Sequence, residues 1–540
     1  MPADLDVLIV GAGPTGLSLA VQLARWGLRF RIVDALTSRH TESRALAVHA
    51  RTLELLDTIG VAETLVARGR RALRVQVYPG MGPPVVLALA DVPVAGTRFP
   101  FVLFVSQAET EAVLAAWLDA RAVTVDRGCR ASVEAEDDDA VRCRLTHADR
   151  DELVTARYVV GCDGAHSTVR HAAGVAFEGD AYPQSFMLAD LEADDRLAPD
   201  AAHVFLGMGG GLGLLPLGRP RTWRAIAVGV PEAADVPEPD PGRELATLQA
   251  FAAATTGRSL GLHDVAWITR FRLHHRQAAS YRRGPFLLAG DAAHIHSPAG
   301  GQGMNTGIQD AWNLGWKLGL VCGGRASDAL LDSYHDERWP VGRFLLRFTD
   351  RLFGFATRAI VRGPVAARLR DAVLRRLLPV AAGSTAIRGR AFHLVSQLGI
   401  RYRSSPLARE GVPRLACGPM AGDRLPDLSV HVDGVEMPLQ RLVSAQAFHL
   451  LWCRDGPVPP AVEAASAWRP IAVHLLSPNA HPANGSALAA LGVVPPATGA
   501  LYLVRPDGHV AYRSAGHDPS DLIQYLDEWL PRLPPDPAAP

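Results

Sequence analysis

The apolar positions of this chain follow two different periods, and the places where the period changes mark its regions. Residues 5–34 contain a short apolar run, then a helical pattern with apolar residues on one side, then a second apolar run. This order predicts a strand, a helix and a strand, the first unit of a parallel α/β sheet. Residues 285–317 predict a second unit, with a buried strand, a tight turn, a glycine-dense loop and a helix from about Asn305.

The rest of the pattern divides the chain further. Ser106 with Glu109 three residues later predicts a helix start, because the two can form a capping box. Short β-like runs over residues 175–280 predict an inserted β-rich domain that forms the second wall of a pocket. The predicted division is an α/β domain at 1–174 and 281–345, a substrate-binding β domain at 175–280, a helical connector at 346–402 and a small α/β domain at 403–540.

The first unit carries a nucleotide-binding motif. Gly11, Gly13 and Gly16 follow the first predicted strand in GxGxxG spacing, and Asp34 ends the second strand. Such glycines permit a tight turn, a close approach to a pyrophosphate and packing of the helix on the strand, while the acid accepts hydrogen bonds from a ribose hydroxyl. A lone GxGxxG is a weak signal, but strand, glycines, helix, strand and acid in this order predict a bound dinucleotide.

The second unit, around residues 285–317, looks like a cofactor cradle. Gly290 lets the chain turn after the strand, so that Asp291 points beyond the strand end. Pro298, Gly301 and Gly303 leave loop amides little covered by side chains, and the helix that follows begins with a partial positive pole. We expect this loop to lie against a flat ligand or a developing anion.

Composition narrows the class of protein. The chain has 540 residues and a formal net charge of zero, which gives no sign of nucleic-acid or membrane partners. Its six scattered cysteines form no CxxC pair, and its start lacks the pattern of a secretory signal. His294 and His296 have no carboxylate or thiolate partners outside their own motif, so no metal is predicted. We expect a cytoplasmic enzyme that is a monomer or a homodimer.

Three separated motifs together resemble one family. GAGPTG with Asp34, CDGAHSTVR at 162–170 and GDAAHIHSPAGGQGMNTGIQDA at 290–311 are similar to the class A flavin-dependent monooxygenases, the aromatic hydroxylases of the para-hydroxybenzoate and phenol hydroxylase type. The match covers roughly residues 1–345 and implies a Rossmann-like FAD-binding domain. AGDRLPD at 421–427 and LVRPDGHVAYRS at 503–514 further resemble the C-terminal thioredoxin-like domain of the phenol hydroxylase branch, whose redox CxxC is absent here.

The resemblance implies roles for individual residues. Asp34 would bind the adenosine ribose of FAD, Asp163 would serve both FAD and NAD(P)H with support from Arg170, and Asp291 would bind the ribityl or pyrophosphate region. The complete set of implied cofactor contacts is Gly11, Ala12, Gly13, Pro14, Thr15, Gly16, Asp34, Ala35, Arg44, Gln107, Ala131, Asp163, Asp291, Pro298, Gly301, Gln302, Gly303, Met304 and Asn305.

The catalytic candidates are Pro298, which would border the oxygen-transfer pocket, and Arg51. By its position Arg51 either reaches phosphates over the first glycine loop or lies on a solvated helix face. No catalytic base is predicted, because the phenol itself can supply the activation. His49, His203 and Tyr182 are further candidates that fit structural roles better.

The implied reaction is monooxygenation. NADPH or NADH would reduce FAD, O₂ would add at flavin C4a, and the hydroperoxide would pass an oxygen atom to an electron-rich ring. The long β insert and the extra C-terminal domain favour a bulky aromatic or phenolic substrate of the polyketide or antibiotic type. Two alternatives stay open: Baeyer–Villiger oxygenation on the same scaffold, and a noncatalytic flavin-binding redox protein.

Overall fold

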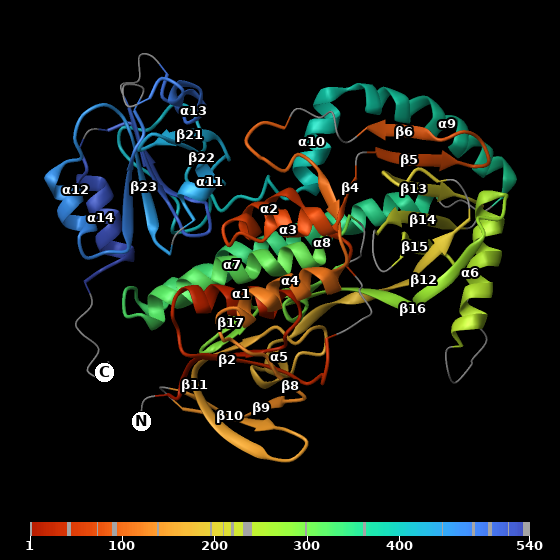
Figure 1. Cartoon of the computed structure of the whole chain (residues 1–540), viewed down its shortest axis with the longest axis horizontal. Coiled ribbons are helices and arrows are strands. Elements are labelled where there is room, and N and C mark those ends of the chain that lie inside the picture. Colours follow the sequence, from red (N-terminus) through yellow and green to blue (C-terminus); the bar gives the residue numbers. More distant parts are fainter. Residues whose placement is uncertain are drawn as a thin grey trace.

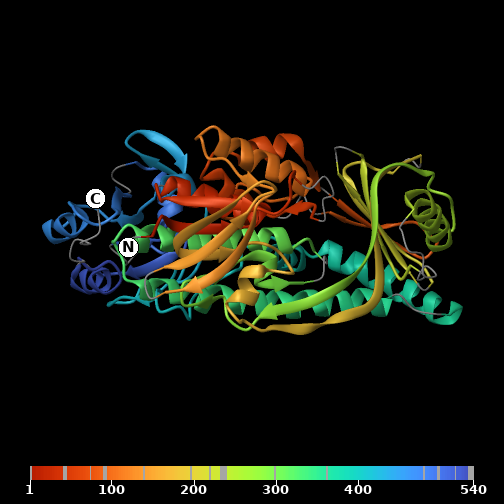
Figure 2. The same cartoon turned by 90° about the horizontal axis from the view of Figure 1, so that it is seen from below.

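The computed structural model is elongated, with three sheet-bearing regions in a row (Figure 1). The first α/β region lies in the middle, the β-rich region lies at one end and the C-terminal region at the other, an order that is also visible from below (Figure 2). No described helix is long and apolar enough to cross a membrane. The described residues are 3–39, 45–72, 74–88, 94–137, 140–194, 197–208, 210–217, 221–230, 240–296, 300–359, 363–444, 446–477, 481–494, 499–516 and 518–532.

The middle region is built on an eight-stranded sheet with parallel central strands. β1 (Leu5–Val10) lies between β2 (Phe30–Asp34) and β11 (Asp151–Gly161), and β18 (Phe286–Leu288) follows β11. The two predicted units, far apart in sequence, are therefore parts of one sheet. The sheet also contains β8 (Asp126–Arg127), β9 (Arg130–Glu136), β10 (Val141–Thr146) and β17 (Arg282–Arg283).

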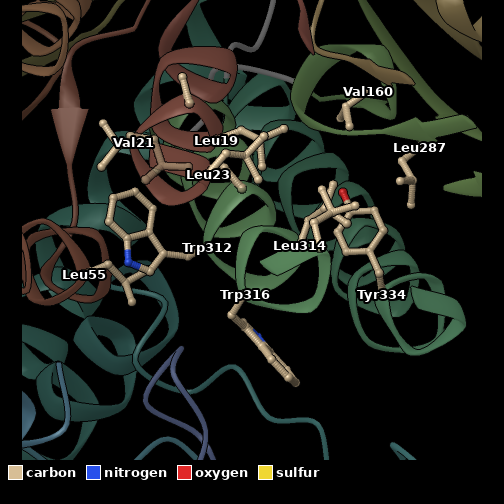
Figure 3. Packing of buried hydrophobic residues seen from close by; sticks show 14 of the residues in the cluster. Leu19, Val21, Leu23, Leu55, Val160, Leu287, Trp312, Leu314, Trp316 and Tyr334 are labelled. Atoms are coloured by element: carbon tan, nitrogen blue, oxygen red, sulfur yellow. The ribbon is translucent and has the colours of Figure 1, made fainter. Parts of the chain in front are cut away.

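Two helices pack closely together over this sheet, α1 (Pro14–Arg25) and α7 (Gly303–Cys322). Small residues allow the close approach, because a Cβ on Gly315 of α7 would stand 2.4 Å from the Cβ of Gln22 in α1. Apolar side chains of both helices fill the surrounding core, and Figure 3 shows Leu19, Val21, Leu23, Trp312 and Leu314 among them.

Smaller elements complete the middle region. The predicted cap is present, because Ser106 Oγ accepts a hydrogen bond from the Glu109 N–H at 3.2 Å. A three-stranded sheet contains β3 (Ala47–Val48), β7 (Val102–Phe104) and β4 (Arg70–Ala72), in that order. The helical elements are α2 (Ala50–Asp57), α3 (Ala62–Arg68), α4 (Gln107–Asp119), α5 (Thr168–Ala172) and the 3-10 turns η1 (Gly290–Ala292) and η2 (Asp328–Leu331).

The β-rich region is a second eight-stranded sheet, with α6 (Pro241–Thr256) packed on one face. Residues 74–88, which the sequence pattern placed with the first domain, supply two of its strands. Its strands, in order across the sheet, are β19 (His294–Ile295), β16 (Leu262–Ala278), β12 (Phe177–Ala193), β15 (Trp223–Val228), β14 (Gly211–Pro216), β13 (Ala201–Leu206), β5 (Arg74–Pro79) and β6 (Val85–Ala88).

The connector consists of three helices, α8 (Asp332–Ala359), α9 (Pro364–Gly383) and α10 (Thr385–Val395). The C-terminal region is an α/β unit on a five-stranded sheet, so the predicted α/β fold with an inserted β sheet and a C-terminal α/β domain is confirmed. Its elements are β20 (Arg409–Glu410), β21 (Ser429–Val432), β22 (Val435–Pro438), α11 (Leu439–Leu442), β23 (Phe448–Cys453), α12 (Pro460–Ser466), β24 (Ile471–Leu475), α13 (Asn484–Ala490), β25 (Ala500–Val504), β26 (Val510–Ser514) and α14 (Ser520–Trp529).

Candidate functional site

The glycine loop after β1 is packed at the limit of main-chain contact. Gly11 has a φ of 103°, and a Cβ there would stand 2.4 Å from the Cys162 carbonyl oxygen. A Cβ on Gly16 would stand 1.9 Å from the Gly11 carbonyl oxygen. At Gly13, by contrast, a Cβ would meet no described protein atom within 4 Å. Close packing at Gly11 and Gly16 therefore fixes the loop, and the space at Gly13 has room for a ligand.

Asp34 is fixed beside the start of α1. Its Oδ2 accepts a hydrogen bond from the Ala12 N–H at 2.7 Å, and its Oδ1 accepts one from the Leu36 N–H at 2.8 Å. Each carboxylate oxygen keeps a further lone pair. Ala35, the next residue, is exposed. The carboxylate thus stands where the sequence predicts a ribose-binding acid.

The DG motif, Asp163 and Gly164 within CDGAHSTVR, contains an unused hydrogen-bond acceptor. Asp163 Oδ2 accepts hydrogen bonds from the Thr168 N–H at 2.6 Å and the Thr168 hydroxyl at 2.8 Å. Asp163 Oδ1 is buried and has no hydrogen-bond partner among the described residues. A buried carboxylate oxygen without a donor is costly, by about 1–3 kcal/mol. This geometry fits a ligand that brings a hydroxyl or amide donor to Oδ1.

Arg170 joins the DG motif to the turn that carries Asp291. Its guanidinium donates to the Ala292 carbonyl at 3.0 Å and to the Ala165 carbonyl at 2.8 Å, and it lies 4.0 Å from the centre of the Phe177 ring. Asp291 itself is exposed at the end of β18. The structure therefore brings the second and third sequence motifs together at one edge of the sheet.

Asp310, inside α7, holds the same turn from below. Its carboxylate accepts hydrogen bonds from the Gly290 N–H at 3.1 Å, from His294 Nε2 at 2.7 Å and from Arg338 Nε at 2.6 Å. Burial raises the pKa of Asp310, but the neighbouring Arg338 and His294 outweigh burial and keep the pKa below its ordinary value. Asp310 lies inside the third sequence motif, but its role was not predicted, because its partners lie 16 to 28 positions away.

The loop before α7 is tied to β3 by its polar side chains. Asn305 Nδ2 donates to the Ala47 carbonyl at 2.7 Å and to the Gly301 carbonyl at 2.8 Å, and its Oδ1 accepts from the His49 N–H at 2.8 Å. A Cβ on Gly301 would stand 2.8 Å from the Ala47 Cβ. The side chain of Asn305 is thus used to shape the loop.

Gln302 and His49 complete this loop. His49 Nε2 lies 2.9 Å from the Gly300 carbonyl, and burial lowers the pKa of His49 to about 4, so the ring is neutral and donates from Nε2 at pH 7. Gln302 Nε2 donates to the same carbonyl at 3.0 Å, and its Oε1 accepts from Gln397 Nε2 at 2.7 Å. Sequence reasoning missed Gln397, because it lies after the connector helices with no motif around it.

The other predicted site residues are distributed as follows. Gln107 Nε2 donates to Glu111 at 2.8 Å, and its backbone N–H donates to the Ala45 carbonyl at 3.2 Å, which places it beside β3. Ala131 is half-buried on β9. Pro14 and Thr15 begin α1, and Gly303 and Met304 begin α7. Arg44 and Pro298 lie outside the described residues.

Arg51 points to a different partner from the one expected. Its side chain is 2 % exposed, and it donates to Glu54 at 3.0 Å and to the Asp507 carbonyl of the C-terminal region at 2.5 Å. Neither a solvated helix face nor a contact with the glycine loop describes this position. The structure does not bring Arg51 together with the other site residues.

Behind the site, α7 is anchored by buried charges. Lys317, the only lysine of the chain, donates to Glu337 at 2.9 Å, and both side chains are fully buried. Arg505 of the C-terminal region donates to the same carboxylate at 2.5 Å through Nη1. Burial raises the pKa of Glu337, but Arg505 and Lys317 outweigh it and lower the pKa to about 2.

Across β3 from this loop lies the inner face of the second sheet. Paired positions place Val77, Val204, Gly213 and Ile226 in one row across four strands, and all four are half-buried. The adjacent row contains the fully buried Arg224–Asp190 ion pair (2.7 Å), and Arg224 also donates to the Ala45 carbonyl at 3.0 Å. The inner face therefore has an apolar, half-buried central row, and the Arg224–Asp190 pair fastens it to β3 at one edge.

One cluster has the composition of a metal site without its chemistry. Single ligand atoms of Asp126, Cys129 and His147 lie within 4.8 Å of one another. Arg31 already pairs with Asp126, and burial raises the pKa of Cys129 to about 11, so the thiol keeps its proton at pH 7. Arg31 therefore already neutralises Asp126, and the protonated thiol is a poor metal ligand.

Comparison with known proteins decides the family. A model of the FAD binding domain matches residues 4–349, and a model of the C-terminal domain of aromatic-ring hydroxylases matches residues 418–532. This chain belongs to the FAD-binding aromatic-ring hydroxylases. Like other members of this family, it is an FAD-dependent monooxygenase.

Alignments with several similar proteins span nearly the full length of this chain. The 6-methylpretetramide 4-monooxygenase of Streptomyces rimosus is 34 % identical over 553 residues, which cover 100 % of this chain and 96 % of that protein. The OxyS anhydrotetracycline hydroxylase from Streptomyces rimosus matches with a TM-score of 0.75 and 31 % identity, covering 98 % of this chain and 100 % of that one. A ternary complex of aklavinone-11 hydroxylase with FAD and aklavinone matches with a TM-score of 0.79 and 26 % identity, covering 98 % and 100 %.

Proposed function

We propose that this hydroxylase adds one oxygen atom to a polycyclic phenol of the aromatic polyketide type, with NADPH or NADH as reductant. The observation that carries the substrate class is the inner face of the second sheet. Its central row has apolar side chains on both sides of Gly213, where a Cβ would meet nothing closer than the Ile226 carbonyl at 3.8 Å. A flat apolar wall with a gap at its centre suits a broad fused-ring ligand.

The relatives support the same substrate class. The names of two similar proteins refer to pretetramide and anhydrotetracycline, and the aklavinone-11 hydroxylase structure contains FAD and aklavinone. Transfer of this class to the present chain is our proposal.

We further propose which residues hold FAD. The open space at Gly13 would take the pyrophosphate, Asp34 would accept from a ribose hydroxyl, and the unpartnered Asp163 Oδ1 would accept from a donor on the cofactor. The loop from Gly301 to Asn305 would lie against the isoalloxazine ring. When bound, FAD supplies the redox and oxygen chemistry.

The residues of the chain have a supporting part in this reaction. The N–H groups at the start of α7 form a partial positive pole that would stabilise negative charge on FAD held beside them. The apolar row of the inner face would keep water from the reacting atoms. Arg51 has no part in the proposed reaction, because its side chain contacts Glu54 and the Asp507 carbonyl, and Pro298 remains a proposed neighbour of the substrate.

The test is aerobic NADPH and NADH oxidation by the purified, FAD-loaded protein, against monocyclic phenols, polycyclic phenols and cyclic ketones, with product masses. We expect polycyclic phenols to accelerate oxidation and to gain one oxygen atom with all rings intact. Turnover of monocyclic phenols alone would overturn the substrate class. Ring-expanded ester products would establish Baeyer–Villiger oxygenation, and FAD binding with no stimulated oxidation would indicate a noncatalytic flavin protein.

A further inference from the structure

A cavity of about 760 Å³ opens outside the site described so far. It lies between α3, β4, the segment 98–101 and the turn at Pro199 and Asp200 before β13. Arginine and phenylalanine side chains dominate its polar and aromatic lining, namely Arg70, Arg71, Arg98, Phe99 and Phe101. A volume in this range is typical of small-molecule sites.

The cavity carries unbalanced positive charge. Its two acidic lining residues are already paired with arginines that do not line it: Asp200 with Arg74, and Glu63 with Arg441 at 3.4 Å. Arg70 and Arg71 have no carboxylate partner within 4.0 Å among the described residues. Arg70 and Arg71 are exposed neighbours on β4 and both line the cavity, so they supply positive charge that suits a ligand with phosphate groups.

The third arginine is part of the wall. Arg98 pairs with Asp57 and, at 3.1 Å, with Asp427 of the C-terminal region. Both of its partners are nearly fully buried, so its position is fixed. Arg98 therefore gives the cavity a rigid rim, while Arg70 and Arg71 have no carboxylate partner among the described residues and can pair with a ligand.

An aromatic floor lies under these charges. Phe99 and Phe101 are 7 % and 8 % exposed, and their rings meet edge to face at 6.2 Å between centres. The Arg71 guanidinium lies 4.6 Å from the centre of the Phe101 ring, which holds it in place. The Arg98 guanidinium likewise lies 5.3 Å from the centre of the Phe99 ring, so the rings support the arginines, and the planar guanidinium groups can contact phosphates and a planar ring.

The cavity also lies close to the loop proposed to hold the flavin. Arg71 on β4 pairs with Leu103 on β7, which pairs with Val48 on β3. Two strand spacings separate β4 from β3, or about 10 Å. Gly301 packs directly against Ala47 of β3. A ligand with two ring systems joined through phosphates can have its phosphates at Arg70 and Arg71 and extend past this narrow sheet toward the flavin loop.

We propose that this cavity binds the phosphates and one ring of the nicotinamide dinucleotide that reduces the enzyme. The assignment rests on the proposed function, because a monooxygenase of this kind needs such a reductant. It names Arg70 and Arg71 as binding residues for the co-substrate, distinct from the residues that hold FAD.

The test is anaerobic flavin reduction, followed by the loss of flavin absorbance at increasing NADPH and NADH concentrations. In Arg70→Gln/Arg71→Gln we expect the Kd of the dinucleotide to rise by about tenfold or more, with the limiting reduction rate and reduction by dithionite unchanged. The matched control is Arg150→Gln/Arg325→Gln, which removes the same charge from exposed positions outside the cavity and should leave the Kd unchanged. FAD content and the melting temperature of each variant show that the fold is intact.

A second measurement uses pyrophosphate as a probe. It should compete with the dinucleotide in the wild type, and both this competition and the salt dependence of the Kd should weaken in Arg70→Gln/Arg71→Gln. An unchanged dinucleotide Kd in that variant would overturn the assignment. A variant that binds only the aromatic substrate more weakly, and the dinucleotide as before, would overturn it as well. If neither NADPH nor NADH reduces the wild-type flavin, the proposed function itself fails, which is a different result.

Discussion

At the junction of β1 and α1, main-chain atoms at Gly11 and Gly16 leave no room for one added carbon, whereas the inner face of the second sheet has free space at Gly213. A Cβ on Gly16 would stand 1.9 Å from a carbonyl oxygen, but a Cβ on Gly213 would approach no described atom closer than 3.8 Å. The first of these surfaces, which we call the backbone wall, consists of main-chain atoms around Gly11 and Gly16 and admits one arrangement. The second, which we call the apolar wall, is the row Val77, Val204, Gly213 and Ile226, and it leaves space that a ligand can fill.

The difference separates two properties of the enzyme. In the proposed function, the backbone wall would determine whether the cofactor binds, and it also determines whether the fold forms, because overpacked main chain has nowhere to move. The apolar wall would determine which substrate fits, because half-buried side chains there can change size without a collision in the core. Substitutions on the first wall should therefore act on stability and FAD content, and those on the second on substrate range.

The largest expected effect is that of Gly16→Ala. The new Cβ overlaps the Gly11 carbonyl, so the loop must open, and we expect protein that unfolds readily and retains no FAD. FAD content after purification and the melting temperature measure this. Gly485→Ala, in α13 with no atom near its Cβ, is the control and should be neutral.

Gly13→Ala sharpens the same test, because its Cβ meets only empty space. We expect its apoprotein to be as stable as the wild type, with FAD affinity reduced. Normal FAD affinity in Gly13→Ala would show that the pyrophosphate does not lie there.

The next effect concerns the support behind the backbone wall. In Glu337→Gln, Lys317 and Arg505 stay buried without their shared carboxylate, so the free energy of unfolding should fall by about 3–5 kcal/mol. Denaturant unfolding measures the change. Glu528→Gln removes an ion pair with Arg409 at the surface and should change stability by less than about 1 kcal/mol. Equal effects of the two variants would mean that the buried charges do not anchor α7.

The pH dependence of stability follows from three buried groups near α7 and the C-terminal region. Burial lowers the pKa of His49 and of His509 to about 4, so the unfolded chain takes up these protons first as the pH falls from about 6.5, and stability decreases down to pH 4. Glu337, with its pKa lowered to about 2, stabilises fully above about pH 4.5 and loses this contribution from there toward pH 2.

Across its window, titration of each of these groups lowers the free energy of unfolding by about 3 kcal/mol as the pH falls. Melting temperatures from pH 7 to pH 3 should fall in both windows, and His509→Gln should flatten the upper one. A melting temperature that stays constant from pH 6.5 to pH 4 would contradict the neutral state of both histidines in the fold.

Sequence reasoning succeeded where a few neighbouring residues determine the structure. The order of strand, glycines, helix and acid around Gly11 to Asp34 places the first wall correctly, because close backbone contacts there need glycine at fixed spacing. It did not predict the role of Asp310 or find Gln397, and it gave Arg51 a different environment. The Arg51 partner Asp507 lies 456 residues away, and such pairings form only when separate regions pack together.

The smallest expected effect on stability, with the clearest effect on function, is that of Gly213→Leu. The position is half-buried in the middle of the inner face, and the nearest atoms to its Cβ belong to Ile226 at 3.8 and 3.9 Å, so the fold should be retained within about 1 kcal/mol. The leucine fills the gap between Val204 and Ile226, so kcat/KM for polycyclic phenols should fall by about tenfold or more, while monocyclic phenols bind as before or better. Relative kcat/KM values for both classes measure the shift, and Gly213→Ala should give an intermediate result. Equal losses for both classes would show that the substrate does not bind at this face, and only the backbone wall would then belong to the proposed site.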